Sequence, residues 1–330
     1  MLILAKTVLG VMLGFIISLV TGLILIPILR KRKVGQSTSK LINERHIKKE
    51  GTPTIGGLIF IIPTIISLIL LYLKGSIGIN HNIIITVFVF LAYALLGFID
   101  DYLKVKKHNN AGLSMKVKFI LQVLIAIIFY VIYKYNGGLT DVTVSLFDFR
   151  IELGYFFGIF ILFLLVGTTN AVNITDGLDG LCGGLSVMAF ISYGVISWGS
   201  YWIVGYQEMA IFCSVLVGSL LGFLVFNTHP ARVFMGDTGS LALGGALATV
   251  AILTRHEISL AVVGGVFVIE TLSSLIQIVA IRKFKKRIFK RAPLHHHFEQ
   301  IGWAETDIVK MFWIVGFMLG MVGVVYGVWL

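Results

Sequence analysis

The chain has 330 residues, of which 57% are hydrophobic and only 13% are charged, and its mean hydropathy is +0.95. Soluble domains carry roughly a quarter charged residues, so too little charge is present to cover a soluble surface, and lipid must form part of the solvent. A net charge of +11 would suggest a nucleic-acid partner in a soluble protein. Here we expect no nucleic acid, because the charge follows a membrane topology.

Ten apolar runs of roughly membrane-spanning length divide the chain. The first run is too long for a signal-peptide core and lacks a small-residue cleavage site, so we interpret it as a retained span. Cys182 and Cys213 fall inside apolar runs and indicate neither a disulfide nor a metal site. We predict an all-α integral membrane protein with one polytopic domain over residues 1–330. The ten predicted helices lie at about 7–29, 55–73, 83–99, 117–135, 154–170, 181–199, 207–226, 240–254, 258–281 and 306–330.

The basic residues divide unequally between the two sides that these ten helices define. Loops on one side hold 22 of the 27 Lys and Arg residues. The positive-inside rule places that side in the cytoplasm and both termini outside. On the outer side, the alternating pattern of residues 141–153 predicts a small β-hairpin. On the inner side, the basic and apolar residues 281–291 either lie on anionic lipid headgroups or form a solvated loop.

Two adjacent aspartates, Asp100 and Asp101, end the third apolar run in "LLGFIDDYLK". Carboxylates are disfavoured at the C-terminal end of a helix dipole, and adjacent ones repel each other. A positive group is therefore expected beside them, either a metal ion or lysines such as Lys104, Lys116 and Lys118. The alternative is a solvated pair just outside the bilayer.

Two loops on the same predicted face are rich in polar residues and glycine. "NAVNITDGLDG" (170–180) supplies Asn173, Asp176 and Asp179, which are residue types that also form turns and helix caps. "FNTHPARVFMGDTGS" (226–240) places Asp237 just before an apolar helix, where backbone N–H groups favour anions such as phosphate. Asp237 is then either an N-cap or a metal ligand. The chain contains neither an EF-hand nor a P-loop motif.

Oxygen ligands and many cations are thus predicted to share one membrane face. Carboxylates, amide oxygens and water suit Mg²⁺ or Mn²⁺, and Lys and Arg suit phosphate. This combination predicts a Mg²⁺-dependent, phosphate-handling site at the inner membrane surface. Glu270 lies deeper, within the run 258–281, where it either pairs structurally or contacts substrate.

Five motifs, in this order along the chain, closely resemble those of the polyprenyl-phosphate N-acetylhexosamine-1-phosphate transferases. They are "GTPTIGG", "GFIDDYLK", "NAVNITDGLDGL", "NTHPARVFMGDTGS" and "APLHHHFE". Within that family, the last motif is similar to the branch that uses UDP-N-acetylmuramoyl-pentapeptide. The resemblance implies a ten-helix, usually dimeric enzyme of the bacterial plasma membrane with its active site facing the cytoplasm. It would use Mg²⁺ to transfer phospho-N-acetylmuramoyl-pentapeptide from UDP to undecaprenyl phosphate, releasing UMP, in peptidoglycan synthesis.

The resemblance also implies roles for individual residues. Asp237 would ligate Mg²⁺, with Asn173 as a weaker second ligand, and Asp237 would act in catalysis together with Asp100 and Asp101. Phe234 would stack on uracil. The other residues expected to line the phosphate, nucleotide and sugar region are Lys49, Thr54, Lys118, Asn173, Asp176, Asp179, Asn227 and Gln277.

The implied reaction needs no strong base, because the attacking oxygen belongs to a lipid phosphate. Positioning and charge neutralisation should therefore supply most of the rate. A one-step attack, with Asp100 removing a residual proton, and a covalent aspartyl-phosphate route both fit these residues. Two other functions stay open: a sister transferase that uses UDP-N-acetylglucosamine, and a transporter. A transporter, however, would place its polar residues near the bilayer midplane.

Three consecutive histidines, His295, His296 and His297, follow the basic stretch. Neighbouring side chains do not all converge on one tetrahedral zinc ion, and no cysteine stands at a suitable spacing. We expect the histidines to approach the diphosphate or the sugar of the donor. His296 is predicted to have the most direct, catalytic role and His295 a second one in substrate binding, while His297 shapes the loop.

Overall fold

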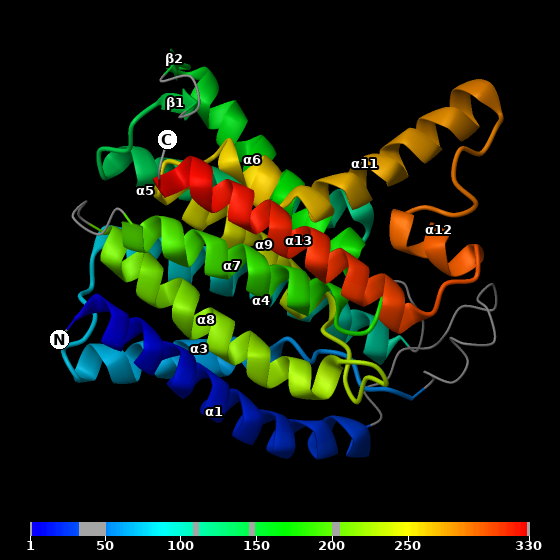
Figure 1. Ribbon diagram of the computed structural model, residues 1–330, viewed down its shortest axis with the longest axis horizontal. Coiled ribbons are helices and arrows are strands. Elements are labelled where there is room, and N and C mark those ends of the chain that lie inside the picture. The colour runs from blue at the N-terminus through cyan, green and yellow to red at the C-terminus, as the bar shows by residue number, and fades with distance from the viewer. Residues whose placement is uncertain (1, 33–50, 108–111, 145–148, 200–204, 329–330) are drawn as a thin grey trace.

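The computed structural model describes residues 2–32, 51–107, 112–144, 149–199 and 205–328. These residues form a bundle of helices with one small sheet (Figure 1). The helices are α1 (Ile3–Lys31), α3 (Leu58–Leu73), α4 (His81–Lys106), α5 (Met115–Tyr135), α6 (Phe156–Thr175), α7 (Leu181–Gly199), α8 (Tyr206–Asn227), α9 (Gly236–Leu253), α10 (Ser259–Val263), α11 (Gly265–Val279), the π-helical turn η2 (Ala280–Phe284), α12 (Leu294–Gln300) and α13 (Glu305–Val328).

Within the described part of the chain, nine helices are long and apolar enough to cross a membrane, α11 being counted together with η2. Helix α3 is the exception, because its 16 residues reach only about 24 Å at a rise of 1.5 Å per residue. The hydrocarbon core of a bilayer is about 30 Å thick. All ten predicted apolar runs are therefore helical, and nine of them meet the length of a membrane span.

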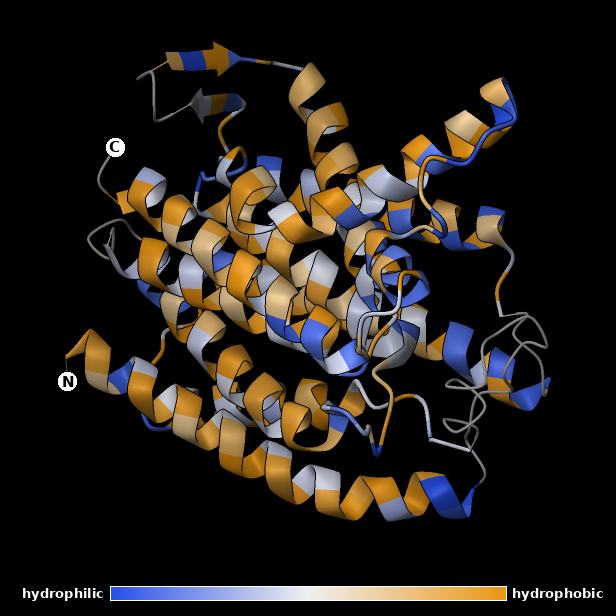
Figure 2. Ribbon diagram, turned by 45° about the vertical axis from the view of Figure 1, so that its right-hand side comes forward, coloured by the Kyte–Doolittle hydropathy of each residue, from blue (hydrophilic) through white to orange (hydrophobic). Residues whose placement is uncertain are grey.

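The exterior of the bundle is apolar. Figure 2 shows orange, hydrophobic ribbon along the lengths of the helices, with blue segments mostly at helix ends and in loops. Helix α1 exposes large side chains such as Met12, Ile16 and Val20 to the surroundings. A helix that is apolar on every side belongs in a core or a membrane, so the helical faces agree with the predicted integral membrane protein.

Helix α9 forms the centre of the bundle. Every residue from Thr238 to Leu253 is buried, and α4 and α6 both pack against α9. Small residues allow this close approach, since a Cβ added to Gly97 of α4 would collide with the carbonyl oxygen of Asp237. The first turn of α9 is thereby held against the end of α4 that carries the two aspartates.

The predicted hairpin is confirmed as a two-stranded antiparallel sheet, and its position outside the cell stays a prediction. Strand β1 (Asp141–Val144) pairs with β2 (Phe149–Glu152), with Asp141 opposite Glu152. An ion pair of 2.7 Å between Asp141 and Arg255 ties the hairpin to the residues after α9. The hairpin therefore belongs to the end of the bundle opposite Asp237.

The predicted helix over 258–281 is divided in two. Helix α10 ends at Val263, Gly264 follows, and α11 begins at Gly265. Consecutive glycines are a frequent cause of such a break. Beyond it, α11 projects out of the bundle (Figure 1) and runs into η2 and the basic stretch. Contact of this stretch with lipid headgroups stays a prediction.

The first turn of α1 and the last turn of α13 lie at one end of the bundle, and α12 lies at the other (Figure 1). The number of membrane passes and the side of the membrane on which the two ends lie stay predictions.

Candidate active site

Asp100 and Asp101 stand in the last two turns of α4, and their side chains are only 4% and 2% exposed. The solvated alternative considered for this pair is therefore wrong. Lys104, one helical turn later, brings its ammonium to 2.7 Å from Asp100 Oδ2 and to 3.6 Å from Asp101 Oδ1. Residues four apart share a helix face, so the same helix supplies the positive partner that its C-terminal dipole requires.

Asp101 acts as an anchor for the start of α9. Its carboxylate accepts hydrogen bonds from the backbone N–H groups of Asp237 and Thr238, at 3.1 and 2.9 Å, and from the Thr238 hydroxyl at 2.7 Å. A carboxylate at a helix N-terminus satisfies orphan donors and complements the helix dipole. Asp101, which belongs to α4, therefore caps the N-terminus of α9. Asp237 does not have the capping role that was one of its two predicted alternatives.

Asp237 is the point where four elements meet. Its Oδ2 accepts from Lys104 of α4 at 2.9 Å and from Lys118 of α5 at 2.5 Å. Its Oδ1 accepts from the side-chain amide of Asn173 of α6 at 2.8 Å, and the same amide donates to Ser240. The prediction that Asp100, Asp101, Asp237, Asn173 and Lys118 come together is thus matched by the geometry.

The three carboxylates are arranged as a cation site. One oxygen from each of Asp100, Asp101 and Asp237 lies within 4.8 Å of the others. Carboxylate oxygens are the donors that Mg²⁺ prefers, and the Lys104 ammonium stands between Asp100 and Asp237 where a cation would be attracted. Because Asp101 already serves the α9 backbone, Asp100 and Asp237 are the donors best able to turn to an ion.

Asp176 lies beside this cluster, directly after α6. Burial raises the pKa of the Asp176 carboxyl to about 8, and the charges of Asp237, Asp101 and Asp179 raise it further. At neutral pH its side chain is therefore mostly protonated and can donate a hydrogen bond. A bound cation or a cationic group would reverse this, because opposite charge favours the carboxylate.

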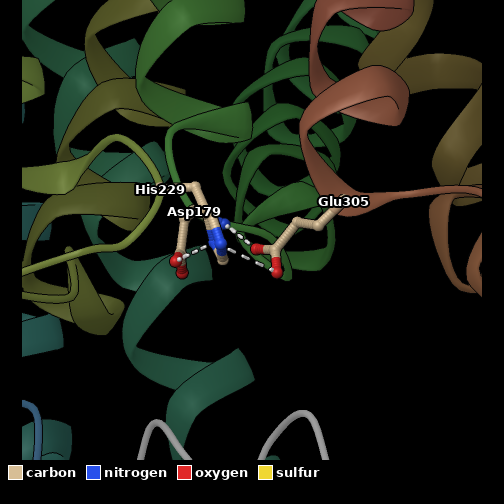
Figure 3. Close-up of side chains that lie close together, drawn as sticks. All are labelled: Asp179, His229 and Glu305. Atoms are coloured by element: carbon tan, nitrogen blue, oxygen red, sulfur yellow. Dashed lines mark hydrogen bonds and ion pairs between the residues drawn. The ribbon is translucent and has the colours of Figure 1, made fainter.

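Asp179, two residues before α7, belongs to a second polar cluster (Figure 3). His229 Nδ1 lies 3.1 Å from Asp179 Oδ2 and 3.6 Å from Glu305 Oε2. The Asp179 backbone N–H donates to Glu305 at 2.8 Å. Three segments distant in sequence are joined here, and neither His229 nor Glu305 was predicted, since no spacing in the sequence links them.

The predicted nucleotide-binding residues frame the same end of the bundle. The backbone of Phe234 pairs with Pro53 and Gly56, at 2.8 Å each, which sets the loop before α3 against the loop before α9. Thr54 is buried beside Gly236, and its hydroxyl has no hydrogen-bond partner among the described residues. The predicted site residue Lys49 lies outside the described residues.

Asn227 and Gln277 both use their side-chain amides on the protein backbone. Asn227 accepts from Gly180 N at 3.2 Å and donates to the Val233 carbonyl at 3.0 Å. Gln277 of α11 donates to the Phe289 carbonyl and accepts from the N–H groups of Ile288 and Phe289. The Asn227 amide thus joins two loops, and the Gln277 amide joins α11 to the turn before α12, roles that the sequence pattern did not indicate.

The three histidines stand in the first turns of α12 and point in different directions. His295 is buried against Glu270, at 2.8 Å, and His296 is paired with Glu299 at 2.6 Å. Burial lowers the pKa of His296, while Glu299 opposes this shift. His297 accepts a hydrogen bond from Lys290 N at 3.1 Å, which fits its expected role in shaping the loop. The three side chains therefore have different polar partners, although the ring centroids of His295 and His296 lie only 4.3 Å apart.

Comparison with known proteins identifies the family. A family model described as glycosyl transferase family 4 matches residues 83–255, which is more than half of the chain. The chain belongs to this family. The match includes Asp100, Asp176 and Asp237, so it covers the cluster described above. Membership confirms the resemblance drawn from the motifs and favours a transferase over a transporter.

Curated relatives match along nearly the whole chain. The phospho-N-acetylmuramoyl-pentapeptide-transferase of Bacillus subtilis (strain 168) is 48% identical over 320 residues, 97% of each chain. The proteins of the same name from Geobacillus sp. (strain WCH70) and Oceanobacillus iheyensis are 46% and 45% identical over 98% and 95% of each chain. The similarity therefore extends beyond the family model to the histidine motif and α13.

Proposed function

We propose that this protein transfers phospho-N-acetylmuramoyl-pentapeptide from UDP to undecaprenyl phosphate, giving lipid I and UMP in the first membrane step of peptidoglycan synthesis. One observation carries the proposal. Asp100, Asp237, Lys104 and Lys118 converge at one end of a membrane-embedded bundle in a chain whose curated relatives bear the name of this activity. Such a cluster combines cation ligands with phosphate ligands.

Asp100 and Asp237 are the proposed ligands of Mg²⁺, with Asn173 holding the Asp237 carboxylate in orientation. The ion would neutralise charge on the donor diphosphate and on the departing UMP. Lys104 and Lys118 now contact Asp237, and both would turn to phosphate oxygens when the carboxylates hold the ion. Electrostatic stabilisation of this kind is the main resource of phosphoryl transfer.

We propose direct attack by the lipid phosphate on the donor. Every oxygen of the three carboxylates is engaged: Asp100 accepts from Leu113 N at 2.7 Å and from Lys104, Asp101 holds α9, and Asp237 holds Asn173 and the lysines. Direct attack requires only that Asp100 and Asp237 exchange these partners for the ion, whereas a covalent route would also require one carboxylate oxygen to form a bond to phosphorus. Asp100, which is paired with Lys104, would take a residual proton from the lipid phosphate.

A trapping experiment separates the two routes. Enzyme incubated with radiolabelled UDP donor but without lipid phosphate should acquire no label, and added UMP should not exchange into the donor. A stable phospho-enzyme that forms under these conditions and is lost in Asp100→Asn would replace direct attack by the covalent route.

The loops around the cluster form the proposed donor site. Thr54 and Phe234 lie on the side of the paired loops before α3 and α9, with Phe234 half-buried, and Phe234 would stack on uracil. Asp176 and His296 lie on the side of α6 and α12, where they would meet the diphosphate or the sugar. We include His296 as a catalytic residue and Asp179 as a contact of the donor.

UMP release with two donors tests the function. UDP-N-acetylmuramoyl-pentapeptide and UDP-N-acetylglucosamine are supplied in parallel, with undecaprenyl phosphate and with or without Mg²⁺. We expect Mg²⁺-dependent turnover of the first donor, and losses of about 100-fold or more in Asp100→Asn and Asp237→Asn. Asp307→Asn is the control, because that side chain is 62% exposed. Turnover of UDP-N-acetylglucosamine alone would replace the proposal by the sister transferase.

We further propose ten membrane passes, including α3, with both termini outside, the active site in the cytoplasm of a bacterium, and a homodimer. Orientation is tested at the two ends of α5 with Lys116→Cys and Asn136→Cys, both exposed positions. The native Cys182 and Cys213 are buried, so background labelling is low. An impermeant maleimide should label only Asn136→Cys in intact cells, and the opposite result would invert the topology. Native mass spectrometry in detergent should give twice the mass of one chain.

A further inference from the structure

A fully buried pair joins α11 to α12. The side chains of Glu270 and His295 are 0% and 1% exposed, and His295 Nδ1 lies 2.8 Å from Glu270 Oε2. The other oxygen, Oε1, accepts from the backbone N–H of His295 at 3.1 Å. Both carboxylate oxygens of Glu270 therefore form hydrogen bonds with His295.

This contact decides which ring nitrogen carries hydrogen. A carboxylate only accepts hydrogen bonds, so Nδ1 must be the N–H donor, and the contact leaves Nε2 as the unused nitrogen. A carboxylate that holds a histidine in one tautomer and one orientation is a recurring device at catalytic sites. Glu270 has this geometry with respect to His295.

The Nε2 atom of His295 points toward the loop between α6 and α7. His295 Nε2 is buried and has no hydrogen-bond partner among the described residues. A Cβ added to Gly177 would collide with it, so the ring edge lies directly against the loop between Asp176 and Asp179. An unpaired buried polar atom is costly, and here it faces the segment that the donor is proposed to contact.

Docking of α12 alone does not account for this arrangement. A buried pair of ionisable residues is often no better for stability than apolar residues of the same volume, and ionisable residues in membrane helices usually serve function. A pair that only docks α12 would also not need to leave the buried His295 Nε2 without a hydrogen-bond partner beside the loop. The orientation of Nε2 toward Gly177 is the feature that a docking role leaves unexplained.

We propose that Glu270 is a positioning residue for the transfer reaction: it fixes His295 in the Nδ1–H form and so presents Nε2 to the Gly177 loop when the donor binds. The inference rests on the proposed function for its kinetic test, although its spectroscopic test does not need turnover. Glu270 touches no reacting atom and acts only through His295.

Two substitutions test the roles of the two ring nitrogens of His295 separately. In His295→Asn the side-chain amide can stand near the place of Nδ1 and donate to Glu270, but nothing occupies the place of Nε2. In Glu270→Gln one oxygen can still accept from His295 N, while the new NH₂ group donates to Nδ1 and moves the ring proton to Nε2. Glu257→Gln is the matched control, a buried acid at the opposite end of the bundle.

We expect His295→Asn and Glu270→Gln to unfold thermally within a few degrees of wild type, yet each to lose about 10-fold or more in kcat, with the KM for undecaprenyl phosphate unchanged. The kcat of the double variant should be no lower than that of the less active single variant, because both substitutions abolish the same function, an unprotonated Nε2 facing the Gly177 loop. Glu257→Gln should keep wild-type kcat. Full activity in His295→Asn would show that Nε2 is not used and would overturn the proposal.

Nitrogen-15 NMR of histidine-labelled enzyme reads the tautomer directly. The His295 signals are assigned by their loss in His295→Asn. Wild type should show a protonated Nδ1, and Glu270→Gln should show the proton on Nε2. An unchanged His295 signal in Glu270→Gln overturns the positioning role even if the variant is inactive. An inactive wild-type preparation with the expected tautomer would instead contradict the proposed function alone.

Discussion

Asp100 and Asp101 are neighbours in sequence but serve different purposes, because successive residues of a helix point about 100° apart. Asp100 faces Lys104 and the loop before α5. Asp101 faces the first turn of α9 and accepts three hydrogen bonds there. The two adjacent aspartates therefore have different partners: Asp100 faces Lys104 at the proposed ion site, and Asp101 holds the start of α9.

Replacing Asp101 by asparagine should destabilise the fold as well as the reaction. An amide has one acceptor oxygen and adds two donors, so at least one buried N–H of α9 loses its partner, at a cost of about 1–3 kcal/mol. Thermal unfolding in detergent should show a clear decrease in Tm for Asp101→Asn and a smaller change for Asp100→Asn. Equal Tm values for the two variants would contradict this division of roles.

Gly97 sets the distance between α4 and α9. An alanine there would force the backbone of Asp237 away, and overpacking of this kind costs about 1–3 kcal/mol. We expect Gly97→Ala to lose most UMP release and to unfold at a lower temperature. Gly167→Ala is the control, because a Cβ at this α6 position meets nothing within 4 Å. A fully active Gly97→Ala enzyme would show that the carboxylate cluster tolerates displacement.

At the scale of elements, the active-site end is held together by side chains that bind backbone. Asn227 joins the α6–α7 loop to the α8–α9 loop, and Gln277 joins α11 to the turn before α12. Such bonds satisfy buried backbone groups where no helix does so. The loops that carry Asp176, Phe234 and the histidines are thus fixed relative to one another.

Gln277→Leu tests the clip between α11 and the turn before α12. Hydrogen exchange of the Ile288 and Phe289 amides should accelerate, because both donate to the side-chain oxygen of Gln277. Activity should fall moderately, because the turn before α12 loses its link to α11. Thr271→Ala is matched to it, since within the described part of the chain the Thr271 hydroxyl donates to the Phe267 carbonyl of the same helix. Exchange that is unchanged in Gln277→Leu and equal to the control would rule out the clip.

At the scale of the whole molecule, the two ends of the bundle carry charge differently. The end with the carboxylate cluster has lysines paired to aspartates, whereas the other end holds Glu257, which is 2% exposed and has no hydrogen-bond partner for either carboxylate oxygen among the described residues. Burial raises the pKa of Glu257 to about 7, although Arg255 opposes the shift. Its proton is thus bound more tightly in the folded protein than in the unfolded chain.

The contribution of Glu257 to the stability of the fold should therefore decrease as the pH rises. The folded-state pKa of Glu257 is raised, so its contribution is fully present below the ordinary value near 4.5 and is lost as the pH passes about 7. The loss amounts to at most about 3 kcal/mol. Unfolding followed from pH 5 to pH 8 should show a flatter profile for Glu257→Gln than for wild type, while Asp307→Asn should leave the slope unchanged. A profile for Glu257→Gln that is as steep as the wild-type profile would contradict the prediction.

Much of the fold could be predicted because a membrane span leaves a long apolar run in the sequence. The positions of the ten helices and of the hairpin follow from such patterns. The break at Gly264 does not, because a glycine can lie within a continuous helix as well as at a break. The same limit applies to the site. Asp100, Asp237 and Asn173 could be grouped by face and chemistry, whereas His229 and Glu305 lie in segments whose approach no local pattern records.

The sequence by itself determined the membrane environment, the helices, and the set of oxygen and ammonium groups available at one face, because hydropathy and residue type are local properties. Only the tertiary structure decided how those groups are used. Packing of α4 against α9 turned Asp101 into a helix anchor, and the direction of α12 separated three identical histidines, His295 toward Glu270, His296 toward Glu299 and His297 toward Lys290. The physical reason is that a side chain's role depends on the partner it meets, and these partners come from distant parts of the chain.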